Sequence, residues 1–391
     1  MAKSKAKWRR VLTGRFLRWW FACKLVRLFP ALGIRLGFFP DSIGLIEGAD
    51  RVLADEHERI EAESFAEDQA FLDRCRQYDS AEKSVELRKG LDVGRRTALY
   101  DDAWIDMATG SILLPKRGRT VLVRGEVANW NATSLRFSRQ RVSVSGRAMP
   151  LLNTTNYFHQ LLENGLRVID LLESGLVDDA PLTLLKVEGR GRVENALYDG
   201  IARLYPDVTV RHLNDSAIAM PDQVVCHFPR DPYWEWPRMN RPTVDRLTAA
   251  FEAVYGSLEP EETDKLYLTR RDVKMRAPVN TEALEAHLID RGFHALTARD
   301  TNHPEQIARF RAARTVVAVH GAGLTNLLFC RPGTRVIEIF PENFVKSPYW
   351  WICRQLGLEH CPVYGGPGDY AQKFQVDIGA VDAALDGLAE S

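Results

Sequence analysis

Two glycines, Gly321 and Gly323, stand where one apolar run, residues 315–320, gives way to another. This pattern predicts a strand that ends at a glycine turn and opens a helix. Glycine lets a ligand approach the backbone closely, and the first N–H groups of a helix have no partner within it. The junction therefore predicts an anion site suited to a diphosphate, formed by Gly321, Ala322, Gly323, Leu324, Thr325 and Asn326. The same pattern also occurs as ordinary α/β architecture without a ligand.

Polar residues follow or lie within three apolar runs of the second half of the chain. Arg270 and Arg271 follow residues 265–269, His320 closes the run before Gly321, and Glu338 lies within residues 334–340. Guanidinium groups bind phosphate oxygens, an imidazole can stabilise a departing phosphate, and a carboxylate can accept from a ribose diol. Together these residues predict a nucleotide diphosphate site. Taken singly, paired arginines are often surface ion-pairing residues, and such a carboxylate is often structural.

The elements that must position these residues alternate along the chain. Strands are predicted at 111–115, 120–124, 142–145, 182–187, 208–212, 223–228, 265–269, 293–296, 315–320, 334–340 and 361–364. Helices are predicted at 157–173, 193–204, 243–255, 281–291, 304–313, from 324 onward, and at 349–356. This alternation predicts an α/β protein built from βαβ units with largely parallel sheets. Ligands of such sheets lie outside the carboxyl ends of the strands.

Two domain-sized halves are predicted behind a basic N-terminal segment. A Pro- and Trp-rich passage at 228–237 interrupts the alternation, so we expect one domain at 49–237 and another at 238–391, with a cleft between them. Residues 49–78 are charged and periodic, which predicts a helical lead-in. Residues 1–48 form a separate segment.

That segment carries most of the charge asymmetry. Residues 1–40 contain ten Lys or Arg and no acidic residue, whereas the rest of the chain has 42 basic and 52 acidic residues. Charges recur too often for a membrane-spanning helix, and the pattern is not that of a secretory signal. We expect an amphipathic helix on an anionic membrane surface, or alternatively one packed on the protein itself. The predicted location is cytoplasmic, peripheral on the inner membrane face.

Other classes of site find little support in the sequence. The six cysteines show no C-x-x-C pair and no zinc-like arrangement with histidine. Because no D-x-D triplet stands at a strand end in a metal-binding context, we expect no metal and no cofactor beyond a nucleotide-sugar substrate. The acidic body and the absence of a recognition motif argue against nucleic acid.

At this level of detail the chain resembles the family 61 glycosyltransferases. The resemblance rests on the segments YLTRRD (267–272), EQI (305–307), HGAGLTN (320–326) and PGTRVIEIFP (332–341), in this order. It implies a GT-B architecture of two facing Rossmann-like domains, a nucleotide-sugar donor held mainly by the C-terminal one, and transfer with inversion. A glycan or glycolipid acceptor is implied, and the basic N-terminus suggests a cell-envelope polysaccharide such as a capsule, exopolysaccharide or lipopolysaccharide.

The family's second signature is altered in this chain. It usually reads HWLLD followed by LPR, and here stands as NYFHQLLE (156–163) with GLR (165–167). The resemblance implies roles for His159, Glu163 and Arg167, which recur every four residues along one helix face, with Asn156 at the start of the motif. We expect Glu163 to be the general base, oriented or replaced by His159, and Asn156 and Arg167 to bind substrate. The alternative is a plain helical His–Glu pair.

Two rival functions remain. His-Gly-Ala-Gly also resembles the oxyanion loop of some lipases and esterases, but the chain has no G-x-S-x-G elbow. A catalytically inactive GT-B-like scaffold protein of a polysaccharide assembly complex is the stronger alternative, because the second signature is altered. Donor hydrolysis or transfer by the purified protein separates enzyme from scaffold.

Overall fold

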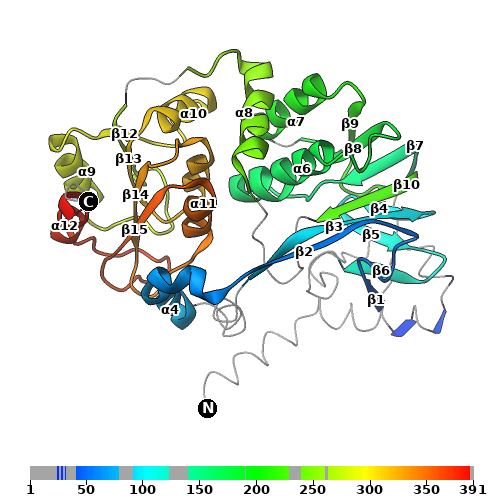
Figure 1. Cartoon of the computed structure of the whole chain (residues 1–391), viewed down its shortest axis with the longest axis horizontal. Helices are drawn as coiled ribbons and strands as arrows, with labels where there is room; N and C mark the ends of the chain where they lie inside the picture. Colours follow the sequence, from blue (N-terminus) through cyan, green and yellow to red (C-terminus); the bar gives the residue numbers. More distant parts are fainter. Residues whose placement is uncertain are drawn as a thin grey trace.

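The computed structural model describes residues 24–25, 28–29, 31, 41–78, 91–122, 140–189, 191–228, 239–259 and 263–387. These residues form a mixed α/β structure with two sheets, one from each half of the chain (Figure 1). The predicted boundary passage and most of the basic N-terminal segment lie outside the described residues.

The second sheet has five parallel strands in the order β12-β11-β13-β14-β15. They are β11 (Lys265–Leu268), β12 (His294–Leu296), β13 (Thr315–Val319), β14 (Arg335–Phe340) and β15 (Glu359–Tyr364). Its helices are α9 (Thr281–Asp290), α10 (His303–Ala312), the 3-10 helix η3 (Ala322–Phe329), α11 (Pro348–Leu356) and α12 (Ile378–Gly387). The strand order reverses between β11 and β13, so this edge is where a doubly wound sheet binds ligands.

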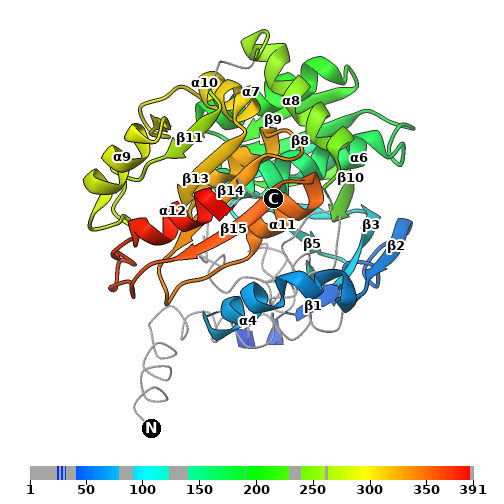
Figure 2. The same cartoon turned by 60° about the vertical axis from the view of Figure 1, so that its left-hand side comes forward.

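Alternation along these strands builds a core on each face of the sheet. Leu266 and Leu268 belong to the core that contains residues of α10, η3 and α11, whereas Tyr267 belongs to the core with α9 and α12. Such strands are buried on both sides and read as continuous apolar runs, which is why the sequence reveals them. The α10 and α11 side faces the first half of the chain (Figure 1), and α9 and α12 lie together on the outer side (Figure 2).

The first sheet differs from the parallel, Rossmann-like sheet expected for this half. It has ten described strands, of which only β10, β7, β8 and β9 form a continuous parallel set. The strands are β1 (Asp41–Gly44), β2 (Arg51–Ile60), β3 (Leu91–Asp101), β4 (Trp104–Asp106), β5 (Ser111–Leu114), β6 (Arg119–Leu122), β7 (Arg141–Pro150), β8 (Leu182–Val187), β9 (Val208–Leu213) and β10 (Ile218–Phe228). Its helices are η1 (Ala62–Asp68), α4 (Gln69–Tyr78), the π-helix η2 (His159–Leu166), α6 (Arg167–Glu173), α7 (Arg192–Leu204) and α8 (Arg241–Tyr255).

Short turns explain the antiparallel strands. The β4–β5 and β5–β6 connections are four-residue turns that contain Gly110 and Gly118, both at positive φ, and turns this short join only antiparallel strands. The expected helical lead-in is also wrong for residues 51–60, which form β2. This strand pairs with β3, and Arg96 meets Asp55 at 3.2 Å while Arg95 meets Glu56 at 3.5 Å across the pair. The charged residues whose spacing predicted a helix therefore form cross-strand ion pairs instead.

Two helices pack on the half opposite to the one expected. Helix α8 follows the predicted boundary yet packs on α7, where a side chain at Gly200 would stand 1.8 Å from the Ala250 carbonyl oxygen. Helix α4 precedes the first sheet's main strands yet packs on the second half, with Phe71 against Phe340 and Trp350. Residue 237 lies outside the described residues, and the predicted domain boundary there stays a prediction.

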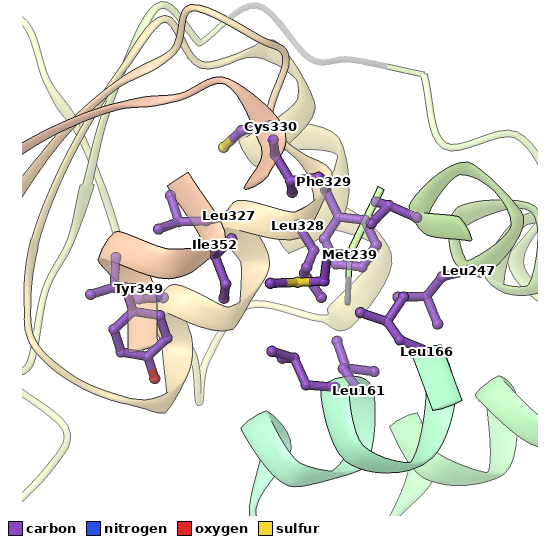
Figure 3. Close-up of a cluster of buried hydrophobic side chains, with 14 of the residues drawn as sticks. Leu161, Leu166, Met239, Leu247, Leu327, Leu328, Phe329, Cys330, Tyr349 and Ile352 are labelled. Carbon is purple, nitrogen blue, oxygen red and sulfur yellow. The ribbon is translucent and has the colours of Figure 1, made fainter. Parts of the chain in front are cut away.

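The halves share one apolar core. Leu161 and Leu166 of η2 and Leu247 of α8 face Leu328 and Phe329 of η3, with Met239 between them (Figure 3). Because η2 and η3 carry the two candidate sequence motifs, this core sets the position of one motif relative to the other.

A buried polar chain braces the first sheet beneath α6. Asp170 accepts from Arg95 Nε at 3.0 Å and contacts His227 Nε2 at 2.9 Å, and His227 Nδ1 lies 2.8 Å from Thr97 Oγ1. Burial opposes ionisation of Asp170, but the hydrogen bonds from His227 and Arg95 outweigh it and lower its pKa to about 2. Thr97, Asp170 and His227 are buried and the Arg95 side chain is 20 % exposed, so this chain lies largely inside the fold.

None of the helices in the described part of the chain is long and apolar enough to cross a membrane. Of the basic N-terminal segment, the described side chains of Leu25, Leu28 and Phe29 are exposed.

Candidate functional site

Arg270 and Gly321 meet where the strand order of the second sheet reverses. Arg270 lies just beyond β11 and Gly321 just beyond β13, and these strands are neighbours in the sheet. A side chain at Gly321 would stand 1.9 Å from Arg270 Nη1, so only glycine leaves room for the guanidinium. The backbone of Gly321 is extended, with φ 171°, so close approach to an arginine explains this glycine and a special turn does not.

Gly323 has a different reason. A side chain there would stand 2.7 Å from Leu268 Cδ2, so this glycine allows η3 to pack closely on β11. Ala322 and Gly323 are half-buried, while Leu324, Thr325 and Asn326 are buried. Of the six residues predicted to surround the anion, the structure thus leaves only the Ala322–Gly323 part of the loop accessible.

Arg276 joins Arg270 at this corner. Its Nε donates to the His320 carbonyl at 3.0 Å, and its guanidinium lies 5.2 Å from the centre of the Phe344 ring. Arg276 has φ +56°, a conformation uncommon for a side-chain-bearing residue and often found at functional sites. Burial, and after it the charge of Arg276, lowers the pKa of Arg270 to about 10.

In the part of the chain that the structure describes, no carboxylate forms an ion pair with either of these cations, although the charge of Asp272 acts on Arg270. Arg270 Nη2 donates to the Met275 carbonyl at 2.6 Å. Its buried Nε has no partner, and among the described residues neither Arg270 nor Arg276 forms an ion pair. Two neighbouring guanidinium groups repel each other, and a bound anion would relieve that repulsion. The corner can therefore hold an anion such as a phosphate.

Arg271 is not brought to this corner. Its Nη1 lies 2.5 Å from Glu285 Oε1 of α9, and its side chain is half exposed. The Arg270 carbonyl accepts from Val273 N at 3.2 Å, so the chain turns at Arg271 and its side chain reaches α9.

Glu338 is placed differently from the ribose-binding role predicted for it. One carboxyl oxygen lies 2.6 Å from His320 Nδ1 and the other 2.7 Å from His360 Nε2, and the residue is fully buried. Burial raises the pKa of Glu338 well above its usual value. Because Glu338 is fully buried and each of its oxygens contacts a histidine, a ribose diol cannot reach it in this structure.

Three aromatic rings connect the second half to η2. His320 lies 5.2 Å from the Tyr349 ring, and Tyr349 lies 5.9 Å from the Phe158 ring, measured between centroids. Phe158 in turn packs edge-on against His159 at 5.4 Å. The histidines of the two sequence motifs, His159 and His320, are therefore separated by two rings.

His159 and Glu163 form the pair that the helix spacing predicts. His159 Nδ1 lies 2.6 Å from Glu163 Oε1. The side chain of Glu163 is 6 % exposed, whereas that of His159 is 31 % exposed. The helix is a π-helix over this stretch, a local distortion frequent at functional sites. Since the imidazole is the more accessible partner, it is the group that can reach a substrate hydroxyl.

The flanking residues of this motif have structural contacts. The Asn156 side chain accepts from Phe158 N at 2.9 Å and so caps the helix. Arg167 is buried and donates to the Pro150 carbonyl at 2.8 Å. Asn164 bonds both the N–H and the carbonyl of Leu152. These contacts fix η2 against the end of β7, and the substrate-binding roles predicted for Asn156 and Arg167 stay predictions.

Tyr157 ties the two motifs together directly. Its hydroxyl donates to Asn326 Oδ1 at 2.6 Å and lies 2.8 Å from His303 Nε2. Asn326 also donates to Gln306 at 3.1 Å. Asn326, predicted to contact the anion, is thus occupied at the contact between the halves.

Sequence reasoning missed Arg276, His360, Tyr349 and Tyr157. His360 lies just before the run predicted at 361–364, and only the structure shows that β15 includes it, two residues before the partner of Glu338. Arg276 lies in an irregular loop whose path no periodicity reveals. Among the described residues no group of three or more His, Cys, Asp or Glu is placed to hold a metal ion, and metal independence stays a prediction.

The comparisons with known proteins cover this region. Residues 157–337 match the family model described as Glycosyltransferase 61. A stretch of 75 residues is 33 % identical to beta-1,2-xylosyltransferase RCN11 of Oryza sativa subsp. japonica, and it covers 19 % of this chain and 14 % of that protein's length. The match to the family begins at Tyr157 and includes the His159–Glu163 pair, Arg270 and the Gly321 loop. Residues 157–337, a little under half of this chain, are thus similar to the glycosyltransferase 61 family.

Proposed function

We propose that the protein is a glycosyltransferase that moves a sugar from a nucleotide-diphosphate donor to an acceptor hydroxyl, with inversion. The observation that carries this proposal is the Arg270–Arg276 corner against Gly321, which lacks a partner carboxylate among the described residues. It lies at the strand-order reversal of a doubly wound sheet, where such sheets bind nucleotides.

In this proposal the corner stabilises the leaving diphosphate. Arg270 and Arg276 bind its oxygens, and the backbone at Ala322 and Gly323 lies at the amino end of η3, where N–H groups favour an anion. His320 stands beside them. Fixed positive charge here supplies the stabilisation that a metal ion supplies in other transferases, so we propose a metal-independent reaction.

The acceptor hydroxyl is activated from the opposite side by η2. We propose that His159 takes the proton and that Glu163 holds its Nδ1–H, which leaves Nε2 as the base. This reverses the roles expected from the sequence, because Glu163 is the more buried of the two. A base on one motif and a leaving-group site on the other agree with single-displacement inversion and with a GT-B layout.

The donor and acceptor are proposed at the level of class. The relative named above is a xylosyltransferase, so a pentose nucleotide is the first donor to try. We propose a glycan or glycolipid acceptor in cell-envelope polysaccharide synthesis and, from the basic segment before residue 41, a site of action at the cytoplasmic membrane face.

A matched pair of arginine variants tests the diphosphate site. A thermal-shift screen against nucleotide sugars identifies the donor, since a bound ligand raises the melting temperature. Arg270→Met should reduce that shift strongly, and Arg271→Met should retain it because Arg271 pairs with Glu285 instead. Equal shifts for both variants, or none for the wild type with any nucleotide sugar, would remove the basis of this proposal.

The alternative is a GT-B-like scaffold protein without transfer activity. The observation that favours it is the departure of residues 156–167 from the family's usual signature. Incubation with the identified donor separates the two, because a transferase releases nucleoside diphosphate by transfer or slow hydrolysis and a scaffold does not.

A further inference from the structure

His360, Glu338 and His320 form a continuous hydrogen-bonded chain inside the second half. The two links measure 2.7 Å and 2.6 Å. Glu338 is fully buried, and the His360 and His320 side chains are 5 % and 9 % exposed. Phe71 of α4 covers His360 at 5.1 Å, and Phe340 stacks on His320 at 5.3 Å. The chain is held rigidly at both ends.

The hydrogen-bonded chain determines which ring nitrogen of His320 is available to a ligand. Nδ1 is engaged by Glu338, so Nε2 is the nitrogen left for another group. The structure gives Nε2 no hydrogen-bond partner among the residues it describes. With Glu338 ionised and His320 neutral, the one proton of this link lies on Nδ1 and Nε2 presents a lone pair. One further proton leaves the link bridged and puts a hydrogen on Nε2, which then donates.

The surroundings of this hydrogen-bonded chain have two opposing effects on its protonation. Burial lowers the pKa of His320, and the charges of Arg276, Arg270 and Lys346 lower it further. Burial likewise raises the pKa of Glu338 and lowers that of His360 to about 3. Tyr349, Cys353 and Tyr364, which also interact with Glu338, stay neutral because burial raises their pKa values. Burial therefore favours the uncharged, protonated chain, whereas the three cations favour loss of its proton.

An anion bound at Arg270 and Arg276 would cancel the second influence. Neutralising these charges removes the repulsion that a proton on His320 experiences. Anion binding and proton uptake by the chain are then linked, and the proton gained is the one that lets Nε2 donate to a phosphate oxygen.

We propose that His360, acting through Glu338, is a positioning residue that holds His320 as a hydrogen-bond donor to the leaving diphosphate, and that the chain gains a proton when a diphosphate binds. This inference rests on the proposed function, because it uses the same Arg270–Arg276 corner. It adds a residue, His360, and a proton coupling that diphosphate binding alone does not require.

Calorimetry with inorganic pyrophosphate tests the coupling without knowledge of the donor. Binding is measured at one pH in buffers of different ionisation enthalpy, and the slope gives the protons exchanged. His320→Asn is the reference for proton exchange. Its side-chain amide can donate to Glu338 from the position that Nδ1 occupies, but it has no counterpart of Nε2. Subtracting its value removes the protons that pyrophosphate itself exchanges. We expect the wild type to take up more protons than this variant, by up to about one per ligand.

Two variants of His360 test its part. His360→Gln keeps a donor near the position of Nε2 and should retain the extra uptake, whereas His360→Phe keeps the ring against Phe71 but removes the donor and should lose it. Binding with equal proton exchange in wild type and His320→Asn overturns this inference and leaves the proposed function standing. So does uptake in His360→Phe that equals the wild-type value. Absence of pyrophosphate binding to the folded wild type overturns both. The wild-type comparison with His320→Asn decides the matter even if His360→Phe does not fold.

Discussion

Gly321→Ala is the substitution for which the structure predicts the sharpest result. The new methyl carbon would stand 1.9 Å from Arg270 Nη1 and 3.0 Å from its Cζ. Carbon and nitrogen atoms in contact need about 3.5 Å, so the guanidinium must move by about 1.5 Å or more. The backbone itself accepts alanine, because φ at this position is extended. The effect thus falls on Arg270 and not on the backbone.

The displaced guanidinium leaves its anchor and its ligand. Its bond to the Met275 carbonyl is 2.6 Å long and cannot survive such a shift. A charge-assisted hydrogen bond to the donor contributes about 1.5–3 kcal/mol, so the donor's Kd should rise about 10- to 150-fold. Isothermal titration calorimetry with the nucleotide sugar found by thermal shift measures this change.

Gly323→Ala is the matched control within the same loop. Its methyl group would meet Leu268 Cδ2 at 2.7 Å, the end of an apolar side chain. Overpacking of this kind costs about 1–3 kcal/mol of stability but leaves Arg270 in place. Both variants should melt earlier, and only Gly321→Ala should bind donor weakly. A folded Gly321→Ala protein with wild-type affinity would refute the assignment of Arg270 to the donor site.

Three further outcomes are expected. His159→Asn keeps a partner for Glu163 but removes Nε2, so transfer should fall about 100-fold or more while donor affinity persists; turnover close to wild type would instead point to Glu163 as the base. The pKa of Asp170 lies at about 2, below the ordinary 3.8 of an aspartate, so its stabilising contribution, about 2 kcal/mol, is present above pH 4 and is lost as pH falls towards 2. Urea unfolding across that range should show the decline in wild type and a flatter profile in Asp170→Asn, which is also less stable at pH 7. Tyr157→Phe removes a donor to buried Asn326 and should cost about 1–3 kcal/mol in the same assay, whereas an unchanged midpoint would show that this contact adds nothing between the halves.

The second half of the fold was readable from its sequence because its strands are buried on both faces. A parallel strand between helix layers is a short continuous apolar run, and the predicted strands at 265–269, 315–320 and 334–340 fall on β11, β13 and β14. The first half was not readable to the same extent. There the charged strand β2 is stabilised by cross-strand pairs with β3, whose partner residues lie about forty positions away.

The candidate site shows the same division. Strand-end positions predicted that Arg270, Gly321 and His320 gather at one edge, and helix spacing predicted the His159–Glu163 pair. Neither signal could separate Arg270 from Arg271, because that choice depends on which side of the chain faces the η3 loop and where Glu285 lies. The glycines were visible in the sequence, but the side chains that require them were not.

The order of apolar and polar residues along the sequence therefore determined the helices, the strands and the residues at their ends, because hydrogen bonding and burial repeat with a fixed period in each. Contacts between elements decided what those residues do. Glu338 serves two histidines and is unavailable to a ribose, His360 and Arg276 reach the site from a sheet edge and a loop, and Tyr157 joins the halves. These pairings depend on distances across the fold that carry no period in the sequence, so only the packed tertiary structure could reveal them.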